Sequence, residues 1–140
     1  ADFGCKIDNY CSDITRTFVI GKPSEKQIKI YNACYEAQTK CVDMVKEGAK
    51  INSICETAEE ITSKHAKSIH SLGHGLGIRV HEAPGIGSYN KNLLKAGMVI
   101  TIEPGVYING FGGVRIEDDV LVTKTGCKIL TKATKKLVQI

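Results

Sequence analysis

Four carboxylates and one imidazole in this sequence are suited to hold metal ions together: Asp2, Asp13, His74, Glu103 and Glu117. Each lies in a glycine-punctuated, strand-like segment, where a rigid backbone lets distant side chains converge. Four carboxylates crowded together would repel one another strongly unless cations separated them. Two divalent ions would neutralise this charge, and such a pair activates water for hydrolysis. The residue types therefore predict a dinuclear metal centre.

The positions of Asp2 and Asp13 need a particular backbone arrangement if the two are to meet. They are an odd number of residues apart, so plain strand alternation would place them on opposite faces. A turn at Asp8-Asn9 would form a hairpin that returns both to one face. The ordinary alternative is that both aspartates are simply turn residues.

The other three candidates also have ordinary explanations. His74 is flanked by glycines and could be a packed strand residue, and Glu103 precedes Pro104 and could be a surface turn residue. The acids around Glu117 could be balanced by Arg115 in a structural ion pair. A carboxylate that follows the apolar run VITI is costly to bury without a partner, which favours a cation.

Four ordered segments carry a resemblance to a known family: DFG with YCSDITRTFVIG, GHGLGIRVHEAP, LKAGMVITIEPGVY and GVRIEDDVLVTKTG. The sequence resembles the pita-bread dinuclear metallopeptidases, which include methionine aminopeptidases, Xaa-Pro aminopeptidases and Xaa-Pro dipeptidases (prolidases). The ligand spacings resemble the proline-specific branch, and so does GVRIEDD, where methionine aminopeptidases tend to have an Ala-Gln-Phe-Glu-His type segment. The resemblance implies hydrolysis of the bond between an N-terminal residue and proline. The alternatives are a methionine aminopeptidase-like enzyme and a non-catalytic binding module on the same fold.

The resemblance also implies a role for each candidate ligand. Asp2 would chelate one metal ion, Asp13 and Glu117 would bridge both, and His74 and Glu103 would complete the second site. A metal-bridging hydroxide would attack the scissile carbonyl, and Glu103 would also act as a catalytic proton relay. Mn²⁺ is the expected metal for this oxygen-rich set, with Co²⁺ or Zn²⁺ as alternatives.

His81 and Arg115 are the candidates for substrate contact. His81 matches the family's substrate-contacting histidine and would bond the carbonyl or the tetrahedral oxyanion. Its alternative is a half-exposed strand histidine. Arg115 would either support Asp13 or Glu117, or pair with the carboxylate of a proline-containing dipeptide or peptide substrate.

The first half of the chain has clear secondary-structure signals. Residues 1–20 are predicted to form a strand, a turn and a second strand. Ser24 and Gln27 form a capping box that starts a helix over 25–47, in which apolar residues recur at helical spacing.

A second capping box, Ser53 with Glu56, predicts another helix that extends to about Lys67, and glycine-rich strands follow from Ser68. This order predicts an α+β domain, with helices backing a curved antiparallel sheet. The resemblance implies the pita-bread (creatinase/aminopeptidase-like) fold with an internal duplication. We therefore expect residues 1–140 to be the C-terminal portion of a catalytic domain, incomplete and nearly inactive alone.

The composition is typical of a globular domain. The net charge is +4, and its lysines are spread along helical stretches, which indicates a solvated face and no nucleic-acid partner. No apolar run approaches the ~20 residues that span a bilayer, and no secretory signal opens the sequence. We expect a cytoplasmic protein without a membrane partner, and a homodimer as the intact enzyme. The six cysteines include no Cys-x-x-Cys pair, and Cys34 and Cys41 share a helix face, which suits buried reduced thiols.

Overall fold

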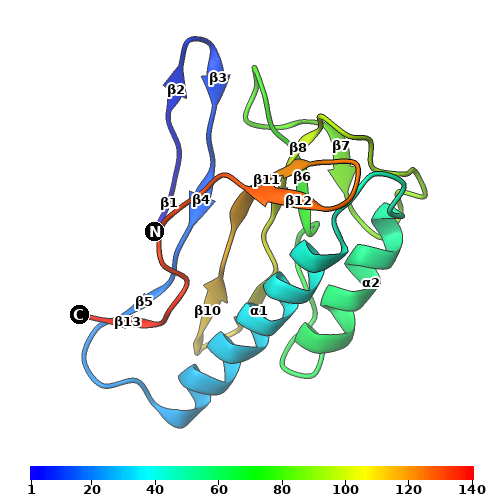
Figure 1. The fold of residues 1–140 in the computed structure, drawn as a ribbon. Helices are drawn as coiled ribbons and strands as arrows, with labels where there is room; N and C mark the ends of the chain where they lie inside the picture. Colours follow the sequence, from blue (N-terminus) through cyan, green and yellow to red (C-terminus); the bar gives the residue numbers. More distant parts are fainter.

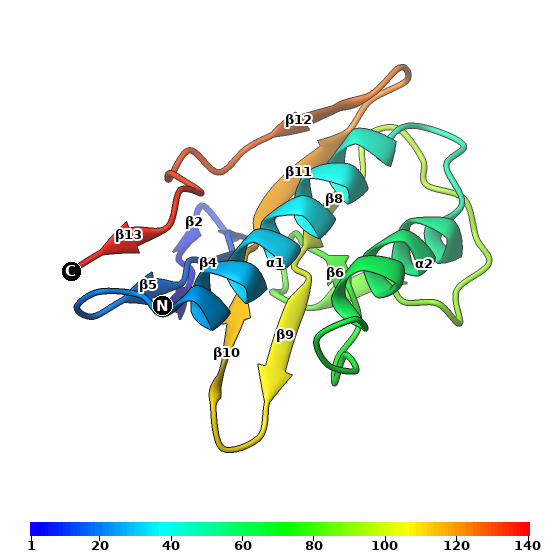
Figure 2. The same cartoon turned by 90° about the horizontal axis from the view of Figure 1, so that it is seen from below.

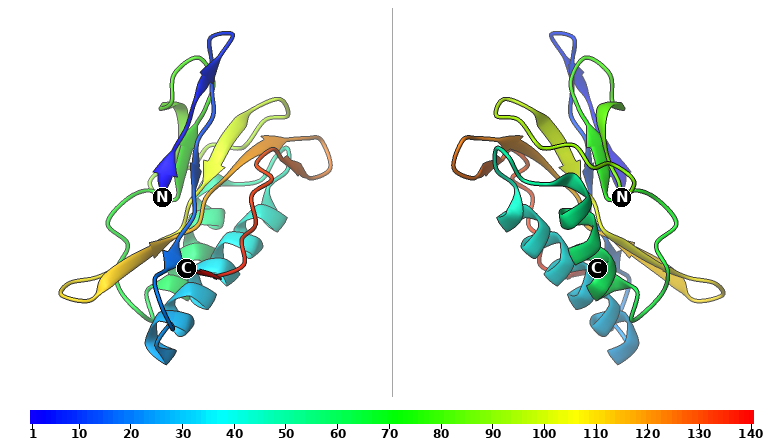
Figure 3. Two further views of the ribbon diagram at one scale, coloured as in Figure 1. Left: turned by 90° about the vertical axis from the view of Figure 1, so that its left-hand side faces the viewer. Right: turned by 90° about the vertical axis from the view of Figure 1, so that its right-hand side faces the viewer.

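The computed structural model describes residues 1–140, and it consists of two helices packed against one face of a five-stranded sheet (Figure 1). The sheet order is β12-β11-β8-β6-β7, and every neighbouring pair is antiparallel. Side views show both helices on the same side of the strands (Figure 3). The predicted α+β arrangement is therefore confirmed. The elements are α1 (Glu25–Met44), α2 (Ile51–Thr62), β6 (Gly73–Gly75), β7 (Glu82–Ile86), β8 (Val99–Ile102), β11 (Asp118–Val122) and β12 (Cys127–Ile129).

The remaining strands form two-stranded ribbons around this sheet. Three ribbons are antiparallel, while β5 and β13 pair in parallel near the C-terminus. The hairpin of β9 and β10 projects beyond the helices when the molecule is seen from below (Figure 2). None of the helices combines the length and the apolar character that a membrane crossing requires. The ribbons pair β1 (Asp2–Phe3) with β4 (Ile14–Thr15), β2 (Lys6–Ile7) with β3 (Tyr10–Cys11), β9 (Gly105–Ile108) with β10 (Gly112–Arg115), and β5 (Phe18–Val19) with β13 (Val138–Gln139).

The N-terminal hairpin turns at Asp8 and Asn9, as predicted. Both residues have positive φ, 49° and 69°, a conformation that Asp and Asn tolerate better than other non-glycine residues. Asp2 lies opposite Thr15 in the register, so the two share a face of the ribbon. Asp13 directly precedes β4, two positions before Thr15, and its side chain lies on that face as well. The turn thus brings the two aspartates to one side despite their odd spacing.

Helix α1 begins at the predicted capping box. The Ser24 side chain accepts a hydrogen bond from the Gln27 backbone, and the Gln27 side chain accepts one from the Ser24 backbone. The helix ends at Met44, slightly before the predicted end. Cys34 and Cys41 are fully buried free thiols, as predicted, and burial raises the pKa of each to about 12.

The predicted start of the second helix is wrong. Helix α2 begins at Ile51 after Lys50, and Ser53 lies inside its first turn without acting as a cap. Its actual start is set by tertiary contacts, because Ile51 is fully buried and its N–H donates to the main-chain oxygen of Asn92. Another segment thus supplies the acceptor for the first N–H of the helix, and Lys50 makes no side-chain cap bond. The helix also ends at Thr62, short of the predicted Lys67.

Side-chain alternation gives the sheet one apolar face and one polar face. Ile100 and Ile102 of β8 are fully buried beneath the helices, and Thr101 and Glu103 project from the opposite face. Glu103 therefore lies on the face that the helices leave open. The core on the helical side contains Cys41, Val42, Val45, Ile51, Ile54, Cys55, Ala58, Leu72, Ile86, Leu94, Ile100, Ile102, Val120 and Val122.

We predict that Gly73 is needed for the close approach of β6 to β8. A Cβ atom at this position would lie 2.0 Å from the main-chain oxygen of Thr101. Gly73→Ala should therefore lower the free energy of unfolding by about 1–3 kcal/mol, the usual cost of overpacking. Urea denaturation measures this change. Gly126→Ala is the matched control, because nothing lies within 4 Å of its added Cβ. Equal losses in the two variants would contradict the prediction.

Candidate metal centre

Two of the predicted ligands lie directly opposite each other on neighbouring strands. Ile102 of β8 faces Asp118 of β11, and the hairpin of β9 and β10 continues with the same register beyond a short break. This register places Glu103 opposite Glu117 within the break. Like charges at directly opposed positions are destabilising. The fold therefore puts two carboxylates where they need a compensating charge.

At these two residues the main-chain N–H groups bond to other segments and not to each other's strand. The N–H of Glu103 donates to the oxygen of Leu72 at 2.8 Å, and the N–H of Glu117 donates to the oxygen of Thr15 at 3.2 Å. Leu72 lies two residues before His74, and Thr15 lies two residues after Asp13. These two main-chain hydrogen bonds therefore bring His74 close to Glu103 and Asp13 close to Glu117.

All five predicted ligands line one cavity of about 670 Å³. Asp13, His74 and Glu117 each offer a ligand atom, and these atoms lie within 4.8 Å of one another. His74 Nε2 is 3.4 Å from Glu103 Oε1 and 3.7 Å from Asp13 Oδ2. Asp2 lines the same cavity from the N-terminal ribbon. The structure thus brings together all five residues that the sequence singled out.

Two threonines orient the glutamates, and sequence reasoning missed both. Thr15 Oγ1 donates to Glu117 Oε2 at 2.5 Å, and Thr101 Oγ1 donates to Glu103 Oε1 at 3.0 Å. Thr101 Oγ1 also accepts the backbone N–H of His74 at 3.0 Å. Strand alternation could have indicated Thr101 as a neighbour of Glu103, because residues two apart in an extended segment lie on the same face.

His74 and His81 lie side by side in the cavity. The centres of their rings are 4.2 Å apart, with the planes tilted by 59°. His74 Nδ1 is 3.0 Å from the oxygen of Gly75, so we assign the proton to Nδ1. The other nitrogen then presents its lone pair to the carboxylates. His81 is exposed at the cavity wall, open to a bound molecule.

Arg115 contacts a different acid from the two considered in the sequence. Its guanidinium forms an ion pair with Asp2, and it bonds neither Asp13 nor Glu117 directly. Its Nε donates to Thr15 Oγ1 at 3.2 Å, and that hydroxyl in turn donates to Glu117. Arg115 therefore supports Glu117 only through the threonine.

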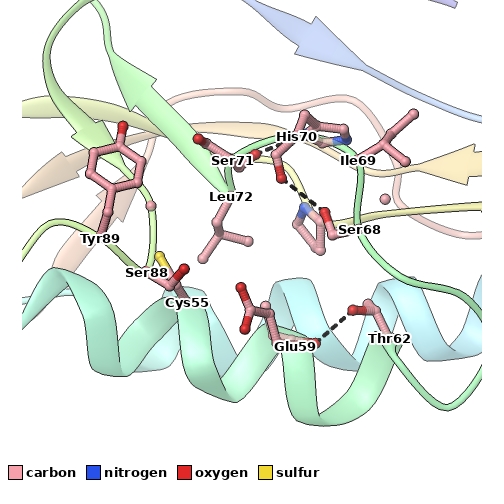
Figure 4. Close-up of a pocket in the computed structure, with 14 residues that line it drawn as sticks. Cys55, Glu59, Thr62, Ser68, Ile69, His70, Ser71, Leu72, Ser88 and Tyr89 are labelled. Atoms are coloured by element: carbon pink, nitrogen blue, oxygen red, sulfur yellow. Dashed lines mark hydrogen bonds between the residues drawn. The ribbon is translucent and has the colours of Figure 1, made fainter.

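A hydrogen-bonded chain continues from Arg115 through Tyr107 to His70, neither of which the sequence analysis identified. Arg115 donates to Tyr107 Oη at 2.8 Å, and Tyr107 Oη is 2.9 Å from His70 Nε2. His70 Nδ1 lies 2.7 Å from the Ser71 oxygen, which assigns its proton to Nδ1 and makes Tyr107 the donor to Nε2. His70 lines both the main cavity and a second one of about 250 Å³ over α2, into which Glu59 points (Figure 4).

Burial raises the pKa of both opposed glutamates. The pKa of Glu117 rises to about 8, with repulsion from Glu103 and the aspartates adding to burial. The pKa of Glu103 rises to about 7, although Thr101 and Arg115 act to lower it. A divalent cation would favour the ionised carboxylates and remove this cost. The donor set and its electrostatics therefore fit a divalent metal.

Comparison with known proteins places the chain in a family. The family model for "Metallopeptidase family M24" matches residues 1–124. The chain belongs to metallopeptidase family M24. This M24 chain is 49% identical, over 97% of its length, to the Xaa-Pro dipeptidase of Pyrococcus furiosus and covers 40% of it. Its fold matches the prolidase from Pyrococcus horikoshii with a TM-score of 0.94 at 47% identity, covering 98% of this chain and 40% of that one. For the X-Pro aminopeptidase from Thermotoga maritima the TM-score is 0.95 at 37% identity, covering 99% of this chain and 40% of that one.

These comparisons confirm the predicted metallopeptidase family and its pita-bread fold. The M24 chain spans about 40% of the length of these relatives. Family membership also confirms the expectation of a divalent metal in general terms. The number and identity of the ions, and the role of each ligand, stay predictions.

The raised pKa values predict how the stability of the metal-free M24 chain varies with pH. Folded Glu103 and Glu117 hold their protons to about pH 7 and 8, whereas an ordinary glutamate releases its proton near 4.5. The folded state therefore binds more protons than the unfolded state across this window, and the free energy of unfolding should fall as pH rises through it. Urea unfolding of chelator-treated protein measures the slope.

The control for this prediction is Glu117→Gln, which should flatten the slope because one titrating group is removed. Added Mn²⁺ should flatten it as well, since the metal replaces the protons. A stability that rises from about pH 5 to 8 in the metal-free protein would contradict the prediction.

Proposed function

We propose that residues 1–140 are the C-terminal, metal-binding portion of the catalytic domain of an Xaa-Pro peptidase, which hydrolyses the bond between an N-terminal residue and proline. The observation that carries the proposal is the convergence of four carboxylates and one imidazole on one cavity, beside Arg115. The names of similar proteins, Xaa-Pro dipeptidase, prolidase and X-Pro aminopeptidase, support the substrate class. Both a dipeptidase and an aminopeptidase on longer peptides fit the site.

Three expectations accompany this proposal. The whole protein is expected to be cytoplasmic and homodimeric, and the 140 residues alone are expected to have little activity. The last follows from coverage, because the chain spans about 40% of its relatives and the substrate pocket needs walls on all sides.

The proposed ligands would hold two divalent cations. Asp13 and Glu117 would be shared by both ions, Asp2 would complete one site, and His74 and Glu103 would complete the other. When bound, such ions polarise a carbonyl and make water a stronger nucleophile. Mn²⁺ is the proposed metal, and Co²⁺ or Zn²⁺ also suit one nitrogen with many oxygens.

Substrate contact, proton transfer and support of the ligands are assigned to individual side chains in the cavity. His81 is assigned to donate a hydrogen bond to the substrate carbonyl or the oxyanion, because its ring lies exposed beside His74. Glu103 is assigned to relay a proton within the cavity. Arg115 already bonds Asp2 and Tyr107, which favours a supporting role over direct pairing with the substrate carboxylate.

Substrate preference tests the proposal directly. The purified whole enzyme, loaded with Mn²⁺, should cleave Xaa-Pro substrates with a kcat/KM roughly 10² or more above that for Met-Ala-Xaa peptides. Steady-state kinetics on the two substrate types measure the ratio. A preference for Met-Ala-Xaa would favour the methionine aminopeptidase-like alternative. Tight metal binding without hydrolysis of either substrate would favour the binding module.

The two cavity histidines should respond differently to substitution. His81→Ala should keep the metal content and lower kcat by roughly 10²-fold or more, the scale for losing a hydrogen bond to an oxyanion. His74→Ala should lose metal, because it removes a ligand. Metal content after dialysis, measured beside kcat, separates the two outcomes. Equal metal loss in both variants would make His81 a ligand and refute its assigned role.

A further inference from the structure

Arg16 is a buried guanidinium directly behind the candidate metal centre. Its exposed fraction is 7%, and it directly follows β4, three residues after Asp13. A guanidinium has five N–H donors in a planar fork, and here it makes five hydrogen bonds. Nε donates to the oxygen of Thr134 at 3.0 Å, NH1 to the oxygens of Thr15 at 2.9 Å and Glu117, and NH2 to Asp118 Oδ1 at 2.7 Å and the oxygen of Ala133 at 2.9 Å.

The NH1 group of Arg16 joins two residues that already contact each other. Thr15 Oγ1 donates to the Glu117 carboxylate, and the N–H of Glu117 donates to the Thr15 oxygen. Arg16 adds a bond to the main-chain oxygen of each. The start of β11 is therefore fixed to β4 through both main chains, and Glu117 cannot move away from Asp13 without breaking these bonds.

The charge of Arg16 is balanced by a carboxylate on the helical side of the sheet. Asp118 is completely buried, and its Oδ1 also accepts from Thr131 at 2.6 Å. Its Oδ2 accepts from Lys135 at 2.6 Å and from Gln38 of α1 at 2.8 Å. Such a pair, with every oxygen satisfied, resists displacement, because leaving either charge unpaired in the interior is costly. Arg16 is therefore held rigidly from behind.

We propose that Arg16 is a positioning residue that sets the affinity of the metal centre by fixing Glu117 relative to Asp13. The inference rests on the ligand assignment proposed above. Residues that orient metal ligands typically change metal affinity or activity by 10–100-fold when replaced. A lysine would keep the charge but lose the planar fork that reaches the Thr15 and Glu117 oxygens together.

Lys135 provides a matched control. It is the second cation on Asp118, at the same kind of distance as Arg16, and it also bonds Gln38. It makes no hydrogen bond to Thr15 or Glu117. Removing either cation disturbs the same buried carboxylate, but only Arg16 reaches a metal ligand.

The experiment compares Arg16→Lys and Lys135→Met with the unmodified whole protein. Mn²⁺ binding to each metal-free protein is measured by calorimetry, and thermal unfolding is measured in parallel. Arg16→Lys should bind Mn²⁺ roughly 10–100-fold more weakly, while Lys135→Met should change affinity by less than about 3-fold, although both variants lose stability. At saturating Mn²⁺, kcat of Arg16→Lys should return close to the unmodified value.

Two results would overturn the inference. One is unchanged Mn²⁺ affinity in Arg16→Lys, and the other is an equal loss of affinity in both variants, which would make Arg16 merely structural. If Arg16→Lys does not fold, Asp118→Asn keeps an acceptor for Arg16 but weakens its anchoring, and unchanged affinity there would overturn the inference too. Mn²⁺ binding needs no substrate, so a protein that binds Mn²⁺ but spares Xaa-Pro bonds would refute the proposed substrate and leave the role of Arg16 standing.

Discussion

The constraint on which this structure depends is the opposition of two buried carboxylates, Glu103 and Glu117, across neighbouring strands. Burial and mutual repulsion raise the pKa of both groups, so the ionised pair is unfavourable without a cation. A fold that places them so must supply compensating charge and keep the side chains from moving apart. Much of the surrounding hydrogen bonding serves that second purpose, as with Thr15 on one glutamate and Thr101 on the other.

The backbone makes this opposition possible by interrupting an otherwise continuous hairpin. The long ladder that runs from β8–β11 into β9–β10 keeps one register, but at the break the N–H groups bond to Leu72 and Thr15 instead. Four segments therefore meet at a single point of the sheet. The helices cover the other face, where Ile100 and Ile102 belong to the core, so Glu103 and Glu117 are left on the open side.

Two arginines stabilise the centre from opposite sides. Arg115 lies in the cavity and pairs with Asp2, and its bond to Tyr107 leads on to His70, which also lines the second cavity. Arg16 lies behind the ligands, pairs with Asp118 and bonds the main chain of Glu117. Arg115 faces the cavity, whereas Arg16 is enclosed by protein. The two cations therefore support the ligands from the two sides of the centre.

The sequence by itself determined the features that depend on neighbouring residues. The capping box at Ser24, the turn at Asp8-Asn9 and the alternation that separates Ile102 from Glu103 all follow from local conformational preferences. The five ligand types and their order also came from the sequence, largely through resemblance, since composition alone left turn and surface explanations open.

Only the tertiary structure decided which distant groups meet. Helix α2 begins at Ile51 and not at Ser53, because a main-chain oxygen from another segment accepts the Ile51 N–H. Arg115 pairs with Asp2, and the buried Asp118 pairs with Arg16 and not with Arg115, which the ordinary explanation of the sequence had offered as its partner. These partners are about a hundred residues apart, and their meeting depends on strand register and on which face each strand presents. Local propensity does not encode that information, because a shift of register by one residue would turn every one of these side chains to the other face.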